Sequence, residues 1–146
     1  MNASRKAYSV AGAVLLVQWF LQLYFIAAAA LDIFNANDNA NDVYAAFKNA
    51  DTYASLHRVN GYLAAVTILI MIGLSIGSRY PWRTTLLTAL LFLLLFVQVV
   101  LAATGGTPVI AGLHGINALI LVGLTGFLTG TNWAFGRRTE MTPRTP

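Results

Sequence analysis

Four long runs of apolar residues constrain this chain more than any other feature of its sequence. They cover about residues 7–31, 56–78, 82–103 and 110–133. Each run approaches the roughly 20 residues that a helix needs to cross a bilayer, and none contains Asp, Glu or Lys. Only 10% of all residues are charged, against roughly 25% in a soluble domain. We therefore predict an all-α membrane protein with four transmembrane helices.

The connections between these runs determine the expected topology. Arg79–Arg83 and Thr104–Pro108 are short turns, so consecutive helices should pack antiparallel in an up-down-up-down bundle. The first connection, residues 32–55, is the longest, and we predict an outer loop there with a short amphipathic helix at the membrane interface. Residues 1–136 should form a single transmembrane domain, followed by a polar cytoplasmic tail over 137–146.

Basic residues are distributed unevenly between the two sides of the predicted bundle. With four crossings, Lys48 and Arg58 fall on one side, and the other side receives the remaining basic residues: Arg5, Lys6, Arg79, Arg83, Arg137, Arg138 and Arg144. Because basic loops stay in the cytoplasm, both termini should be cytoplasmic in a multi-pass inner or plasma membrane protein. The basic tails fit topology signals or lipid headgroup contacts, and we expect no nucleic-acid partner.

Several kinds of chemistry are excluded by composition and motif. The chain has no cysteine, which excludes disulfides, iron–sulfur clusters, thiolate-ligated haem and cysteine zinc sites. The apolar runs have no acidic residue for proton or cation transport, and the sequence has no zinc-protease motif or phosphate-binding loop. An electron carrier or a subunit of a complex is therefore expected rather than a stand-alone enzyme.

An internal repeat relates the two halves of the chain. Leu56–Gly61 and Leu113–Ala118 share the pattern Leu-His-x-(Val/Ile)-Asn-(Gly/Ala) at an offset of 57 residues. Phe20–Gln22 matches Phe96–Val97–Gln98 more weakly, at an offset of 76. The bundle should therefore consist of two hairpins of common design. Because the second and fourth helices run in the same direction, the repeat is parallel, with its twofold axis along the membrane normal.

The repeat places the two histidines, His57 and His114, at similar depth near the outer face, on helices that should be diagonal in the bundle. With neighbouring helix axes about 8 to 10 Å apart, diagonal axes are about 12 to 14 Å apart, which suits a flat haem between two imidazoles. Neutral imidazole also ligates iron without adding a charge in a low dielectric. We therefore predict one haem b with bis-His ligation.

Five further polar residues belong to the predicted site. Arg58 is placed to meet a haem propionate at the outer rim. Asn60 and Asn117 lie three residues after the histidines and so on nearly the same helix face, near the ligating ring or the cofactor edge. Gln22 and Gln98 are further polar candidates. The alternative stays open that the histidines and amides only join helices through hydrogen bonds, which contribute about 1 kcal/mol each in membrane bundles.

The Leu-His-Arg-x-x-Gly start of the second helix (Leu56–Gly61) and the Leu-His-x-x-Asn start of the fourth (Leu113–Asn117) resemble one four-helix half of the haem A synthase family. They also resemble small, functionally uncharacterised four-helix membrane proteins with paired histidines, and the plan is similar to b-type membrane cytochromes. The resemblance implies that His57 and His114 are axial ligands. The synthases place a Glu three residues before the first histidine, where this chain has Ala54, so the resemblance implies haem binding rather than haem A synthesis.

The predicted function is thus that of a membrane b-type cytochrome, transferring electrons within or beside a respiratory or photosynthetic chain. Iron with two protein ligands has no free position for oxygen, which favours electron transfer. The expected partners are the lipid bilayer, other membrane protein subunits and a quinone. The alternative function is that of a cofactor-free accessory or assembly subunit of a larger membrane complex.

Overall fold

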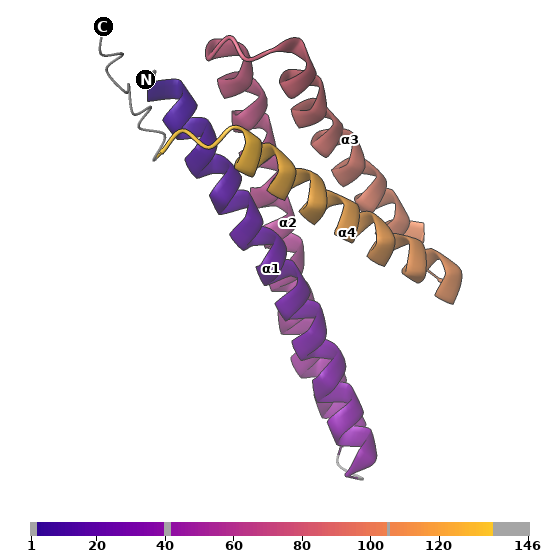
Figure 1. Ribbon diagram of the computed structural model, residues 1–146. Coiled ribbons are helices and arrows are strands. Elements are labelled where there is room, and N and C mark those ends of the chain that lie inside the picture. Colours follow the sequence, from indigo (N-terminus) through magenta and orange to yellow (C-terminus); the bar gives the residue numbers. More distant parts are fainter. Residues whose placement is uncertain (1–2, 40–41, 105, 136–146) are drawn as a thin grey trace, which may run out of the picture.

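The computed structural model describes residues 3–39, 42–104 and 106–135, and these ranges form helices and no strands (Figure 1). The helices are α1 (Ala3–Asp38), α2 (Val43–Gly77), α3 (Trp82–Thr104) and α4 (Pro108–Thr131). All four are long and apolar enough to cross a membrane. The prediction of an all-α chain with four such helices is confirmed, whereas the predicted polar tail lies outside the described residues.

The first two helices are much longer than the sequence suggested. Where a loop was expected over residues 32–55, α1 continues to Asp38 and α2 begins at Val43. The prediction of a long outer loop with a separate interfacial helix is therefore wrong. Figure 1 shows the α1–α2 hairpin projecting well beyond the ends of α3 and α4.

Small side chains explain why these helices continue past the apolar runs. Ala36 of α1 and Ala46 and Ala50 of α2 are buried in the projecting part of the hairpin, because two helices with alanine at their contact approach closely. The carboxylate of Asp42 caps the start of α2 by accepting hydrogen bonds from two backbone N–H groups of its first turn. Such a cap stabilises a helix by about 0.5 to 2 kcal/mol.

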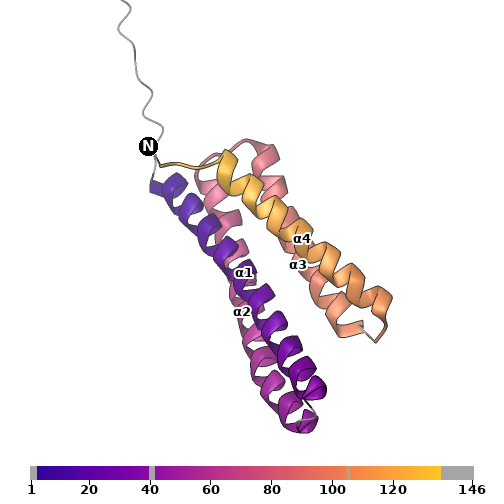
Figure 2. The ribbon, with the colours of Figure 1, turned by 60° about the horizontal axis from the view of Figure 1, so that its bottom comes forward.

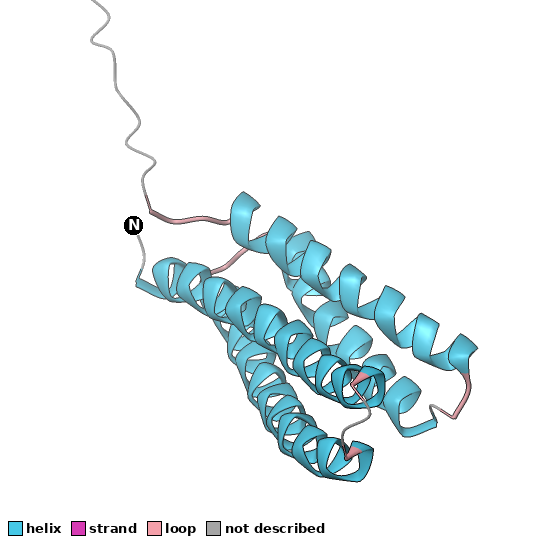
Figure 3. Ribbon diagram, turned by 90° about the horizontal axis from the view of Figure 1, so that it is seen from below, coloured by secondary structure: helices cyan, strands magenta, loops and turns pink. Residues whose placement is uncertain are grey.

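The helices are arranged as two antiparallel hairpins, α1–α2 and α3–α4. The hairpins lie against each other near the α2–α3 connection and diverge toward the opposite end (Figures 1 and 2). Contacts join α1 to α2 and α4, and α3 to the same two helices, so α2 and α4 are diagonal as expected. The view along the hairpins in Figure 3 shows the two pairs side by side.

Two buried hydrogen bonds connect the hairpins. The hydroxyls of Tyr8 and Thr88 are 2.8 Å apart, and Trp19 Nε1 donates to Thr125 Oγ1 at 2.9 Å. Around them lies an apolar core of fully or almost fully buried side chains: Leu15, Ile68, Met71, Leu91, Leu121 and Leu128. This core holds the hairpins together at one end and leaves them free to separate at the other.

The outer faces of the four helices are strongly apolar. Within an apolar segment of 18 residues in each helix, only 17% to 28% of residues are buried inside the protein. Large apolar side chains such as Phe20, Leu93 and Leu119 are more than half exposed. Soluble proteins rarely expose a contiguous apolar surface on this scale, whereas it is typical of a multi-pass membrane protein.

Candidate cofactor site

The two histidines make the same contact in the two hairpins. His57 Nδ1 on α2 lies 3.3 Å from the backbone oxygen of Gln22 on α1. His114 Nδ1 on α4 lies 3.2 Å from the backbone oxygen of Gln98 on α3. The two histidines are related by the sequence offset of 57 residues and the two glutamines by that of 76. The repeat in the sequence is therefore also a repeat of contacts.

The asparagines repeat a second contact, one helical turn further along. Asn60 Nδ2 donates to the backbone oxygen of Gln18 at 2.8 Å, and Asn117 Nδ2 donates to that of Leu94 at 2.9 Å. Asn117 Nδ2 also donates to Oε1 of Gln98 at 2.6 Å. Each hairpin is therefore held by a histidine and an asparagine bound to successive turns of the neighbouring helix.

These contacts determine which nitrogen of each histidine is available. A carbonyl oxygen only accepts hydrogen bonds, so the Nδ1 of each ring carries the proton. In that tautomer Nε2 has a free lone pair, the arrangement found in histidines that ligate metals. No hydrogen bond of either Nε2 occurs within the described ranges.

Both histidines line a cavity between the diverging hairpins. Its volume is about 480 Å³, within the range of roughly 300 to 1,000 Å³ typical of ligand sites. A second groove, of about 560 Å³, lies between the outer parts of α1 and α2 and contains no histidine. The first cavity is lined by Gln22, His57, Arg58, Gly61, Tyr62, Ala65, Phe92, Leu95, Phe96, Gln98, Val99, Ala102, Ala103 and His114.

The cavity interrupts the symmetry of the repeat. Trp19 and Leu95 are equivalent at the offset of 76 residues, but only Leu95 lines the cavity. Trp19 is 5% exposed and its indole reaches Thr125 on α4, so it fills the corresponding space on the α1–α4 side. Sequence reasoning missed this difference, although the mismatch between a tryptophan and a leucine within the repeat was its signal.

Four of the predicted site residues besides the histidines are amides, and the structure divides them. Asn60 and Asn117 are not among the residues that line the cavity, and their amides join the helices of each hairpin; a place for them near a cofactor stays a prediction. Gln98 lines the cavity and accepts from Asn117. Gln22 also lines it, and its Oε1 is buried without a hydrogen-bond partner in the described part of the chain.

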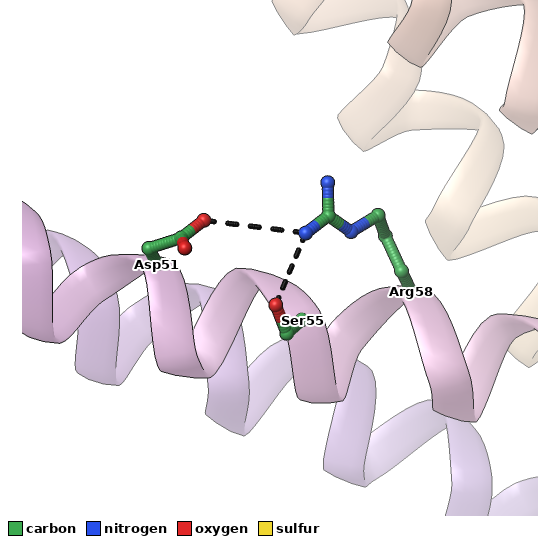
Figure 4. A network of polar contacts seen from close by, with 3 residues as sticks. All are labelled: Asp51, Ser55 and Arg58. Atoms are coloured by element: carbon green, nitrogen blue, oxygen red, sulfur yellow. Dashed lines mark hydrogen bonds and ion pairs between the residues drawn. The ribbon is translucent and has the colours of Figure 1, made fainter.

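Arg58 lines the cavity, but its guanidinium is already partnered (Figure 4). One nitrogen donates to Ser55 Oγ at 3.0 Å and lies 4.0 Å from a carboxylate oxygen of Asp51. The side chains of this ion pair are 65% and 78% exposed, and exposed pairs contribute at most about 1 kcal/mol. The arginine can therefore exchange this partner for another anion at low cost.

The donor set of the cavity does not form a closed site for a bare metal ion. Among residues 3–39, 42–104 and 106–135, no three His, Cys, Asp or Glu side chains come together. Structural zinc sites require four such ligands. Two imidazoles beside an apolar cavity fit instead a metal whose other positions are filled by a macrocycle.

Comparison with known proteins finds one family of unknown function, which matches part of the chain. Residues 44–105 match a family of unknown function, DUF6220. The match covers α2 and α3 and so includes His57 and the apolar cavity walls, but not His114. No curated protein and no solved structure matches the chain. The resemblance to haem A synthases stays a prediction.

Proposed function

We propose that this protein is a membrane b-type cytochrome that holds one haem b between His57 and His114 and carries electrons. The observation that supports this most directly is the shared geometry of the two rings. Each Nδ1 is bound to a backbone carbonyl of the adjacent helix, which leaves each Nε2 with a free lone pair, and both histidines line the same cavity. A pair of histidines that served only to join helices would not need a common cavity.

The residues around the histidines fit this group. The hydrogen bonds to the carbonyls of Gln22 and Gln98 orient the rings and make Nε2 more basic. Phe92, Leu95 and Phe96 supply apolar contacts and exclude water from the cavity. When bound, the haem would supply one-electron exchange between ferric and ferrous iron.

An unfilled apolar cavity would be costly, because it forfeits the dispersion contacts of its lining. A ligand in the cavity would restore those contacts, and Arg58 would pair with its carboxylates.

We also propose that the bundle lies in an inner or plasma membrane with both termini in the cytoplasm. The apolar outer surface supports the membrane location. The excess of Lys and Arg at the end where the hairpins converge supports the orientation. The cavity and the projecting α1–α2 hairpin then face the outer side.

An absorption spectrum of the purified protein, oxidised and then reduced, tests the proposal. We expect a Soret band and the narrow visible bands of six-coordinate, low-spin haem b. His57→Ala and His114→Ala should each abolish the low-spin spectrum, because each removes one of two axial ligands. Thr67→Val is the matched control, since Thr67 is a partly exposed polar residue of α2 that bonds only to its own helix and does not line the cavity.

A second variant tests the cavity with both histidines intact. Leu95→Trp places an indole where the repeat has Trp19, and should prevent haem binding by filling the cavity. Circular dichroism and gel filtration would confirm that each variant is folded. A wild-type protein without a Soret band, or a Soret band unchanged in the His57→Ala, His114→Ala double variant, would refute the cytochrome.

A further inference from the structure

The cavity is not enclosed by the four helices equally. Its walls come from α2 and α3, whereas α1 and α4 each contribute a single residue, Gln22 and His114. Three of its large apolar lining side chains are more than half exposed: Tyr62 by 73%, Phe96 by 62% and Val99 by 59%. These three form the mouth of the cavity, which therefore opens sideways between α2 and α3.

The mouth lies at a height along the helices where lipid hydrocarbon chains would surround the protein. Tyr62 lies 15 residues (62 to 77) before the end of α2, which is about 22 Å along the axis. This distance is less than the roughly 30 Å thickness of the hydrocarbon layer. In the proposed orientation the cavity is thus accessible from within the bilayer.

Two polar groups at this opening lack partners. The hydroxyl of Tyr62 makes no hydrogen bond within the described ranges, although water is scarce at this depth. The carboxamide of Gln22 lies close by, because its Nε2 is 3.2 Å from the position that a Cβ of Gly61 would occupy. Gly61 therefore lets the amide reach α2 beside Tyr62. This Nε2 of Gln22 makes no hydrogen bond within the described ranges, so its N–H groups are free to donate.

We propose that the α2–α3 opening binds the ring of a lipid-dissolved quinone. Such a molecule has a flat apolar ring that fits between Phe96 and Val99, and ring oxygens that accept hydrogen bonds from Tyr62 and Gln22. An acyl chain would fill the apolar space but offer no acceptor to the Tyr62 hydroxyl or to Nε2 of Gln22. Binding at this opening does not require haem; a role of the quinone as electron partner rests on the proposed function.

Calorimetric titration of the protein in detergent micelles with decylubiquinone, a short-tailed benzoquinone, tests this inference. Tyr62→Phe should weaken binding about fivefold, the equivalent of one net hydrogen bond of about 1 kcal/mol. Tyr24→Phe is the control, since it removes the hydroxyl of a tyrosine that is 60% exposed on α1 and does not line the cavity.

The repeat supplies a second matched pair. Val99→Trp narrows the mouth and should weaken binding about tenfold or more, the effect of overpacking by 1 to 3 kcal/mol. Leu23→Trp introduces the same side chain at the equivalent position of the first hairpin, outside the cavity, and should leave the affinity unchanged.

The results separate this inference from the cytochrome. Saturable quinone binding that depends on Tyr62 and Val99, in a protein without a Soret band, would support the inference and refute the haem. A Soret band with no saturable quinone binding, or equal weakening by Val99→Trp and Leu23→Trp, would refute the quinone site alone.

Discussion

Asn60 and Asn117 make different numbers of hydrogen bonds, so their substitution should lower the free energy of unfolding by different amounts. Asn60 donates one interhelical hydrogen bond, to a backbone oxygen that also belongs to the helical ladder of α1. Substitution by leucine, which has a similar shape, should therefore cost only the net value of that bond, about 0.6 kcal/mol in a membrane bundle. Asn117 donates two bonds, and its loss leaves Oε1 of Gln98 unpaired. The two bonds together contribute about 1.2 kcal/mol, and the unpaired oxygen adds about 1 kcal/mol or more. Asn117→Leu should thus cost about 2 kcal/mol.

Reversible unfolding of the haem-free protein by sodium dodecyl sulfate in mixed micelles, followed by circular dichroism, measures both free energies. The double variant should equal the sum of the single variants within about 0.5 kcal/mol, because the asparagines belong to separate hairpins and share no partner. An Asn60→Leu cost equal to or larger than that of Asn117→Leu would refute the reasoning, since it would mean that the additional bond to Gln98 contributes nothing.

Two further predictions concern packing and orientation. Gly12→Ala should destabilise the bundle by about 1 to 3 kcal/mol, because the added Cβ would collide with the hydroxyl of Thr129; Gly73→Ala, where the Cβ meets open space, should be neutral in the same unfolding assay. The chain has no native cysteine, so single cysteines report orientation directly: Asn49→Cys should react with a membrane-impermeant maleimide on intact cells and Pro81→Cys only after permeabilisation. The reverse labelling pattern would contradict the proposed orientation.

The number of helices and the repeat were determined by the sequence alone. A run of about 20 apolar residues is a local property, and lipid or protein surroundings both favour a helix for it. The shared Leu-His-x-(Val/Ile)-Asn pattern likewise identified two equivalent hairpins, and the equivalent contacts of His57 and His114 agree with it.

The ends of α1 and α2 were decided by tertiary packing. Hydropathy marks the part of a helix that suits lipid, not the point where the helix stops. Residues 32–55 are rich in Asn, Asp and Ala, so their composition indicates a loop. The structure shows instead that Ala36 and Ala50 are buried where the two helices pack.

The division of roles within the site also required the structure. Residues three apart on a helix differ by about 60° in direction, so spacing cannot distinguish an asparagine that faces a cavity from one that faces a neighbouring carbonyl. In this fold His57 reaches both the carbonyl of Gln22 and the cavity, while Asn60 reaches only a carbonyl. The opening between α2 and α3 depends on the smaller Leu95 standing where the other hairpin has Trp19. The sequence shows this difference in volume, but its effect on the cavity depends on how the two hairpins pack against each other.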